Sequence, residues 1–244
     1  MPSSLVVMAR RLARGPVWAI ATIVVFQGAL PCQNACAAVT YTLGTTFNGV
    51  SPTSTAPYLT ASFNGTGGTV TLTLTASLNV ASEFIDEVAF NVNPSFTPSA
   101  LTIVQNPIAN PIPTLISNTT QNAQNLGGGG SAGSGFDIDI KWGTAGPPTN
   151  PSRFNGTDVV SFTITRTGLT ENDFNFTNTG SAAAFFAADV QGIPLAGGGT
   201  TSGAIKNGGS GGPNLVPEPS TFVMALGALV PLGMVMVRRR RLEA

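Results

Sequence analysis

Two acidic residues, Asp137 and Asp139, have the types and spacing that could do chemistry. They alternate with Ile138 and Ile140 in a segment with the pattern of a β-strand, which would place both carboxylates on one face about 7 Å apart. Such a pair could bind Ca²⁺, which prefers Asp and Asn oxygens, or serve as the acid and base of a glycoside hydrolase. We favour a simpler hypothesis, in which Asp137, Asp139 and Lys141 form an outward-facing row that keeps an edge strand soluble.

Other reactive groups are scarce. The chain has no histidine, which excludes Ser-His-Asp, Cys-His and histidine-metal sites. Glu83, Asp86 and Glu87 form a second acidic group, which we expect at a solvated strand end, where Ca²⁺ would bind only with help from loop carbonyls. Residues 171–173 follow a Gly-Leu-Thr sequence and are typical of a turn. We therefore predict no catalytic residue and no cofactor, with weakly bound Ca²⁺ at Asp137 and Asp139 as the alternative.

The aromatic and charged residues narrow the classes of partner. Trp142 is in phase with Ile138 and Ile140, so we expect it in the core. Beyond the first 37 residues there is one tryptophan, with Tyr41 and Tyr58 as the tyrosines, and this scarcity argues against a strong lectin. Between two terminal arginine clusters the chain carries four basic and ten acidic residues, a formal charge of −6. A negative body repels phosphate backbones, so we expect no nucleic-acid partner.

The elements that would position these groups are β-strands. Thr, Val, Ile and Phe alternate with a period of two, and Gly, Pro and Asn separate the runs, which is the strand signal. Short strands with one wet face predict an all-β fold, an antiparallel β-sandwich or jelly roll over residues 38–196. The expected strands lie within residues 58–63, 69–76, 88–92, 101–104, 136–142, 158–166 and 182–190.

Two stretches lack this pattern. Residues 105–135 contain three prolines and a run of four glycines, so we predict a long mobile loop there. Residues 197–215 are rich in glycine, which is typical of a flexible linker.

The first 37 residues have the pattern of a secretory signal peptide. Three arginines precede an apolar stretch over residues 17–30, too short to span a bilayer comfortably, and predict a signal helix. Ala35 and Ala37 fit the small-residue rule for cleavage before Ala38. Both cysteines lie in this segment, so the mature chain would form no disulfide. The basic residues are Arg10, Arg11 and Arg14.

The end of the chain carries a second targeting pattern. A stiff motif over residues 216–221 precedes an apolar stretch over residues 222–237 and a cluster of arginines. Sixteen helical residues reach roughly 24 Å, somewhat less than a ~30 Å hydrocarbon core, so we predict a short transmembrane helix. Arginines hold their end in the cytoplasm, which leaves the body outside. The motif begins with Val216, Pro217, Glu218 and Pro219, and the stop is Arg238, Arg239, Arg240 and Arg241.

A Pro-Glu-Pro motif, an apolar helix and a terminal arginine cluster, in this order, resemble the PEP-CTERM sorting signal of Gram-negative bacteria over residues 216–241. The resemblance implies recognition by a membrane-embedded exosortase, which removes the tail and passes the body to the cell surface or extracellular polymer matrix. The partners it implies are the export machinery, exosortase, the inner membrane transiently, and exopolysaccharide. The alternatives are a plain C-terminal anchor, a weak Ca²⁺- or glycan-binding module and, most remotely, a hydrolase.

Overall fold

A computed structural model describes residues 38–79, 82–107, 110–127, 130, 133–146, 150–207 and 214–216. None of these residues is in an α-helix, and no helix in this part of the chain has the length and apolar character needed to cross a membrane. The predicted signal helix, with Ala35 and Ala37, lies outside the described residues, as do the predicted transmembrane helix, Pro217 to Pro219 and Arg238 to Arg241.

The described chain consists of short β-strands, so the all-β prediction is confirmed. Two short 3₁₀-helices, η1 (Pro98–Ala100) and η3 (Glu171–Phe174), interrupt them. The strands are β1 (Ala38–Gly49), β2 (Leu59–Thr66), β3 (Thr69–Ala76), β4 (Phe84–Phe90), β5 (Thr102–Gln105), β6 (Leu115–Ser117), β7 (Gln124–Asn125), β8 (Ser134–Phe136), β9 (Ile138–Lys141), β10 (Phe154–Asn155), β11 (Val159–Thr165), β12 (Phe186–Pro194), β13 (Thr200–Asn207) and β14 (Asn214–Val216).

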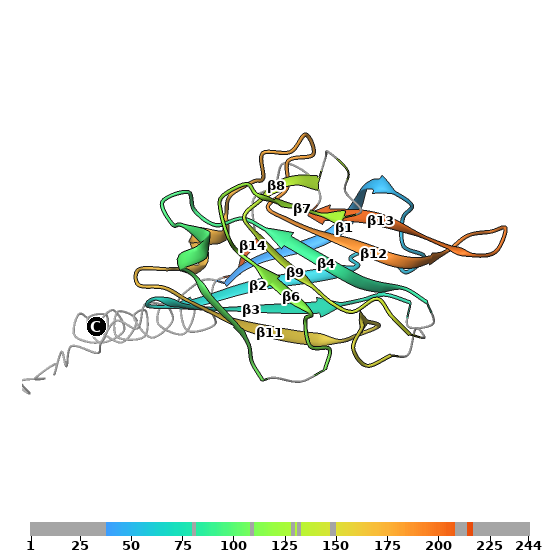
Figure 1. The fold of residues 1–244 in the computed structure, drawn as a ribbon, viewed down its shortest axis with the longest axis horizontal. Coiled ribbons are helices and arrows are strands. Elements are labelled where there is room, and N and C mark those ends of the chain that lie inside the picture. The colour runs from blue at the N-terminus through green and yellow to red at the C-terminus, as the bar shows by residue number, and fades with distance from the viewer. Residues whose placement is uncertain are drawn as a thin grey trace, which may run out of the picture. The chain divides into compact units, whose positions relative to one another are not determined.

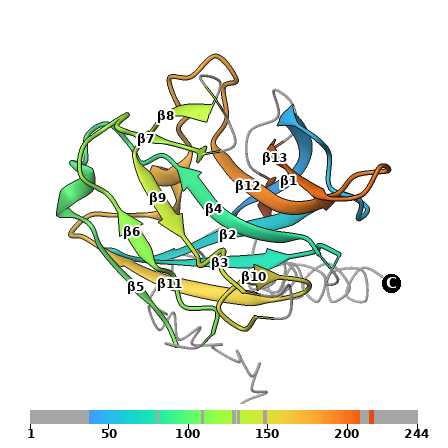
Figure 2. The same ribbon diagram turned by 45° about the vertical axis from the view of Figure 1, so that its right-hand side comes forward.

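Twelve of these strands form one continuous antiparallel sheet (Figure 1). Its strands follow the order β5-β11-β3-β2-β1-β13-β12-β4-β9-β6, while β10 pairs with β4 and β14 pairs with β1. The two end strands of this path, β5 and β6, are consecutive in the chain, so the sheet curls until it is nearly closed (Figure 2). Strands β7 and β8 form a separate two-stranded sheet.

The core lies inside the curl and follows from the period-two pattern. In β3 the apolar residues Val70, Leu72 and Leu74 are fully buried, while the threonines between them are not. Every residue of β11 pairs with one of β3, and Val160, Phe162 and Ile164 of β11 are buried in the same phase. Phe63 stacks on Phe174 at 4.4 Å between ring centroids and belongs to the same buried cluster as the apolar residues of β4 and β9. One core therefore joins strands from the whole length of the sheet.

The predicted loop over residues 105–135 contains regular structure. Strand β6 pairs with β9, with Leu115 opposite Lys141, and β7 pairs with β8. The prolines of this stretch precede β6, and the Leu-Ile-Ser sequence of β6 itself has no residue that prevents a strand. The prolines therefore mark the connection before β6, and the glycine run lies between β7 and β8, rather than the whole segment being a loop.

The predicted linker over residues 197–215 is wrong, because it contains β13, which lies between β1 and β12 in the sheet. Ala204 and Ile205 of β13 are fully buried. Gly203 is needed for close packing rather than for flexibility, since a Cβ atom there would collide with the Val50 carbonyl oxygen. The body thus extends beyond residue 196, and the glycines that suggested a tether lie partly inside the sheet.

Both ends of the described body meet at one strand pair. Strand β14 pairs with the start of β1, so that Ala38 lies opposite Val216. Val216, the first residue of the predicted sorting motif, is therefore part of the sheet. The chain enters and leaves this folded unit at the same place.

Candidate functional site

Asp137 and Asp139 are not on the surface, and the predicted outward row is wrong in this respect. Asp137 occupies a bend between β8 and β9, whereas Asp139 lies within β9. The two residues are 4% and 2% exposed. Each takes part in a different hydrogen-bond network, so the structure does not bring the two carboxylates to one shared site.

A covering segment explains this burial. Leu126 is buried in a small apolar cluster with Ala89 and Phe136, on the outer face of the sheet. The backbone N–H of Gly127, the next residue, donates a 2.7 Å hydrogen bond to Oε2 of Glu87. Residues 126 and 127 are distant in sequence from the strand residues that they contact. The alternating pattern of β9 therefore could not predict that its charged face is covered.

Asp137 holds two backbone segments together. Its Oδ2 atom accepts a 3.0 Å hydrogen bond from the N–H of Val92, and its Oδ1 atom accepts a 2.7 Å hydrogen bond from the N–H of Asn122. Asn122 has a φ of 56°, a left-handed conformation that asparagine tolerates better than most residues. The carboxyl group therefore fixes the turn at Asn122 against the end of β4.

A cavity of about 180 Å³ opens above Asp137. Its floor consists of buried residues, Asn91, Val92 and Asp137, and its half-buried wall includes Phe176. The rim is exposed and consists of Pro94, Gln121, Asn122, Thr177 and Thr179. The cavity is therefore open to solvent and is lined by both polar and apolar residues.

Asn91 is the unusual residue of this floor. It is 2% exposed, and its Nδ2 atom has no hydrogen-bond partner among the described residues. A buried amide without a partner costs about 1–3 kcal/mol. Sequence reasoning missed Asn91, although a lone amide between Phe90 and Val92 in an apolar strand was a usable signal.

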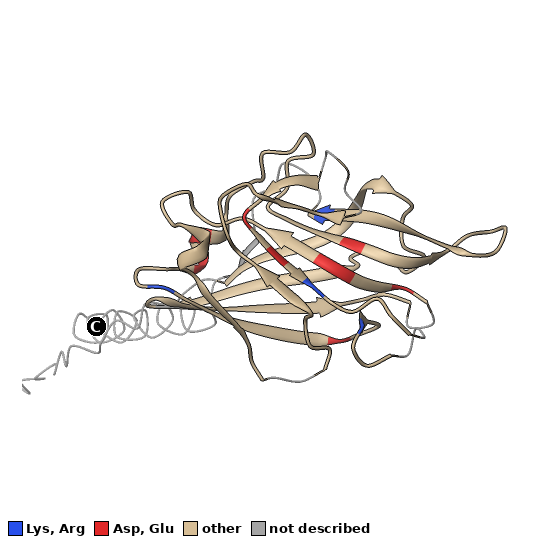
Figure 3. Ribbon diagram, viewed as in Figure 1, with Lys and Arg blue, Asp and Glu red and all other residues tan. Residues whose placement is uncertain are grey.

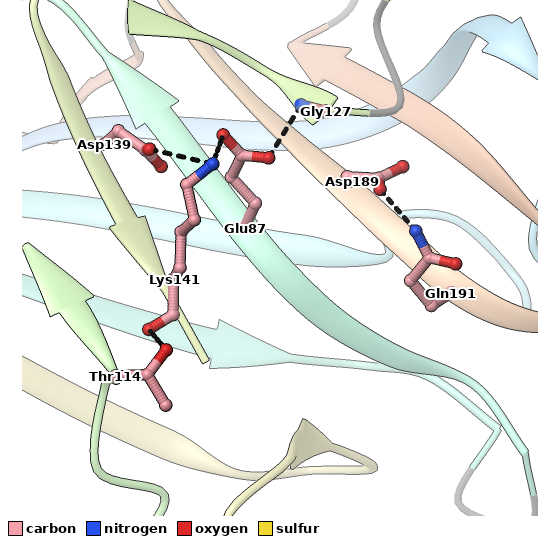
Figure 4. A network of polar contacts seen from close by, with 7 residues as sticks. All are labelled: Glu87, Thr114, Gly127, Asp139, Lys141, Asp189 and Gln191. Atoms are coloured by element: carbon pink, nitrogen blue, oxygen red, sulfur yellow. Dashed lines mark hydrogen bonds and ion pairs between the residues drawn. The ribbon is translucent and has the colours of Figure 1, made fainter. Parts of the chain in front are cut away.

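Asp139 belongs to a second, charged site on β4 and β9 (Figure 4). Lys141 Nζ lies 3.2 Å from Asp139 Oδ2 and 3.0 Å from Glu87 Oε1. Lys141 and Glu87 are directly opposite in the pairing of β9 with β4. The Lys141 side chain is 37% exposed, whereas those of its two partners are 3% exposed, so the lysine lies at the mouth of a buried acidic site.

Two further acids lie on the other side of Glu87. Asp189 of β12 is opposite Glu87 in the strand pairing, and its Oδ2 atom accepts a 2.7 Å hydrogen bond from Gln191 Nε2 (Figure 4). Asp86 precedes Glu87 in β4, and its carboxyl group is close enough to Asp189 for the charge of Asp189 to affect its pKa. Asp189 was not singled out from the sequence, although one acid among Ala187, Ala188 and Val190 was a visible sign.

The acidity of these groups follows from burial and from each other. Burial, followed by the charge and the hydrogen bond of Asp189, raises the pKa of Asp86 to about 8. Burial and Glu87 raise the pKa of Asp139 to about 7, against the opposing effect of Lys141. Burial also raises the pKa of Asp189. The cluster therefore retains protons at pH values where an ordinary aspartate has lost them.

The remaining sequence candidates have structural roles. The solvated position expected for Glu83 is wrong: Glu83 is 1% exposed and accepts hydrogen bonds from Thr53, Ser54 and the backbone of Asn79. The predicted turn at residues 171–173 is η3, which begins with a capping box between Thr170 and Asp173.

Trp142 is buried as predicted and packs 4.9 Å from the Phe154 ring. Among the described residues, no group of three or more His, Cys, Asp or Glu side chains is arranged to hold a metal ion. The chemistry available at the two sites is therefore hydrogen bonding above Asp137 and proton storage around Glu87.

Comparison with known proteins supplies no relative: no protein family, curated protein or solved structure matches this chain.

Proposed function

We propose that this protein is an exported, non-enzymatic ectodomain that is sorted to the cell surface or an exopolysaccharide matrix through its C-terminal tail. The signal peptide would direct export, and the apolar stretch over residues 222–237 would hold the chain in the inner membrane until an exosortase removes it. In this proposal the curled sheet acts as a compact sandwich-like body that stands outside the membrane.

The observation that carries this proposal is the pairing of Ala38 with Val216. Adjacent ends suit a body that is held at both ends during export, because neither tether then has to cross the fold. The predicted cleavage point before Ala38 and the predicted motif beginning at Val216 lie at these adjacent ends. The pairing supports a tethered ectodomain and is independent of the sequence motifs themselves.

The internal use of charge also supports a structural role. The carboxylates of Glu83 and Asp137 accept hydrogen bonds from loop backbone groups, and Glu87 binds both a loop N–H and a lysine. Charge-assisted hydrogen bonds of this kind hold long loops to a sheet without a disulfide. The same groups are thereby occupied in stabilising the body.

The test is the mass and location of the native protein in its own host. We expect wild-type protein to lack residues 1–37 and the tail and to reach the surface or polymer fraction. Replacing Pro217 and Pro219 with alanine preserves the apolar stretch and the arginines, so it separates a sorting signal from a plain anchor. We expect this variant to remain in the inner membrane with its tail, whereas the matched variant Pro213→Ala should be processed normally. Normal processing of the Pro217/Pro219 variant would overturn the sorting proposal.

A further inference from the structure

The cavity above Asp137 combines a buried donor with a buried acceptor. The Nδ2 atom of Asn91 has no hydrogen-bond partner among the described residues, and Asn91 is one of the residues that line the cavity. The carboxylate oxygens of Asp137 each accept one backbone N–H, and a carboxylate oxygen has the lone pairs to accept a second hydrogen bond. A ligand that both donates and accepts hydrogen bonds would satisfy these two residues together.

The remaining lining decides which ligand class fits. Thr177 and Thr179 add hydroxyl groups at the rim, and Phe176 adds an aromatic wall. The lining includes no lysine or arginine, so it offers no charge for an anion. It includes one carboxylate, whereas Ca²⁺ takes six to eight oxygen ligands. A pyranose carries hydroxyl groups that can donate and accept hydrogen bonds, and its ring has an apolar face that can pack on an aromatic side chain. It therefore matches the polar groups and the Phe176 wall of this cavity.

The size of the cavity limits the ligand further. Its volume of about 180 Å³ is below the range of about 300–1,000 Å³ that is typical of pockets for drug-sized molecules. One sugar ring is therefore the appropriate scale, with neighbouring units of a polymer continuing into solvent past the exposed rim.

The rim is tied in place without a ligand. Gln121 Nε2 donates hydrogen bonds of 2.8 and 3.2 Å to the carbonyl oxygens of Pro94 and Phe96. Elsewhere on the rim, the N–H of Thr179 donates to the Gly135 carbonyl oxygen at 3.3 Å. Gly135 permits this approach because a Cβ atom there would collide with Thr179. A pre-formed site loses little conformational freedom when its ligand binds.

We propose that this cavity binds a single neutral sugar unit of a polysaccharide, with Asn91 and Asp137 as its buried hydrogen-bonding pair. The inference deepens the proposed matrix role by naming a ligand class, and it rests on that role only for the expectation that the sugar belongs to a polymer. Binding itself is a property of the folded chain wherever the protein is located.

The test is binding of glucose, galactose, mannose and N-acetylglucosamine, each added separately to the purified full chain. The detergent must be zwitterionic and free of sugar head groups, because a glycoside detergent would compete for the site. Saturation-transfer NMR measures the contact, and the melting temperature measures the linked stabilisation. The decisive variant is Asn91→Leu, which keeps the approximate side-chain volume and removes both polar atoms.

The matched control is Asn64→Leu, an exposed position in a second hollow formed by Ser62, Asn64, Thr71 and Thr73 on β2 and β3. We expect at least one sugar to bind, and Asn91→Leu to weaken its binding by about tenfold or more while Asn64→Leu leaves it unchanged. Asn91→Leu should fold at least as well as wild type, since it removes an unpaired buried amide. If Asn91→Leu does not fold, Thr177→Val is used instead. This variant removes a hydroxyl group at the rim, and we expect it to weaken sugar binding as well.

Three results would overturn the proposal: no sugar bound, binding that survives both Asn91→Leu and Thr177→Val, or binding lost only in Asn64→Leu. Because the assay uses purified protein, these results are independent of whether the tail is sorted or processed. If the protein is sorted correctly but binds no sugar, the proposed function stands and the sugar site is overturned. If the protein binds a sugar but is not sorted, the sugar site stands and the sorting proposal is overturned.

Discussion

The sheet has a neutral half and a charged half. Strands β1, β2, β3, β5 and β11 contain no charged residue, and their polar positions are mainly threonine, serine and asparagine. The charged residues of the large sheet lie on the adjacent strands β13, β12, β4 and β9 (Figure 3). Both halves bury the same kind of apolar residue in the core, so the difference concerns only the outer face.

The difference teaches that charge on a strand does not imply exposure to water. In the neutral half Thr71 and Thr75 are exposed, as their alternation predicts. In the charged half Glu87, Asp139 and Asp189 are at most 2% exposed, because other parts of the chain cover them. The outer-face residues that carry charge are thus less exposed to solvent than the threonines on the outer face of the neutral half.

The largest effect should come from removing the cation of the charged half. Lys141→Met leaves Glu87 and Asp139 buried without their positive partner. Breaking a fully buried pair costs about 3–5 kcal/mol, and we expect about 2–3 kcal/mol here because Lys141 is partly exposed and water screens its charge. Urea unfolding of the full chain measures this loss.

The matched control for that variant is Lys206→Met. Lys206 donates a hydrogen bond to the Ala183 carbonyl oxygen and has no ion pair among the described residues. Its replacement should change the free energy of unfolding by no more than about 0.5 kcal/mol. Equal losses in the two variants would mean that the carboxylate cluster does not depend on Lys141.

A smaller effect is an inverted dependence of stability on pH. The pKa of Asp86 is raised to about 8 and that of Asp139 to about 7, so the folded state binds more protons than the unfolded state above pH ~4. Stability should therefore fall as the pH rises from about 4 to about 8, and the melting temperature should be lower at pH ~9 than at pH ~5. Proteins with ordinary salt-bridged carboxylates gain stability over much of this range.

Asp86→Asn should weaken this dependence and raise the melting temperature at pH ~9, because it removes the charge that forms at Asp86. The control is Asp158→Asn, next to the neutral strand β11, which leaves the cluster unchanged. A melting temperature that does not fall with pH, or that responds equally to both variants, would show that the cluster does not govern the pH response.

The smallest effect should come from the outer face of the neutral half. Thr71→Val on β3 removes an exposed hydroxyl, keeps a β-branched side chain and touches no charged group. We expect the free energy of unfolding to change by less than about 0.5 kcal/mol. A loss comparable to that of Lys141→Met would indicate that the neutral face is also covered, for instance by another molecule.

The sequence allowed four of the five strands of the neutral half to be predicted, whereas β1 was missed, and it allowed the charged half to be predicted only in outline. The strict alternation of β3 and β11 predicted both the strands and their buried residues, because a half-buried strand has a period of two. The same rule located β9 but not the burial of Asp139, since the neighbouring Glu87 and Phe136 are covered by Leu126 and Gly127 from a separate segment. Local patterns report the geometry of one strand and carry no information on what packs over it.

The glycine-rich C-terminal part and the cavity were harder for different reasons. Gly203 suggests flexibility in sequence, whereas in the structure it permits β13 to approach Val50. The cavity depends on Asn91, Asp137 and Thr179, which come from three separate segments, and on a polar atom being left without a partner. Sequence reasoning selected Asp137 but could not identify its neighbours.

The place of β13 between β1 and β12 also sets when the fold can be completed. As the chain is made from its N-terminus, β1 is the first described strand to appear, yet one of its edges pairs with β13 and β14, the last two. Strand β12 likewise waits for β13. Contacts between strands so distant in sequence slow folding, because a long loop must close before they form. Until β13 is made, the edges of β1 and β12 that pair with it have no partner in the sheet.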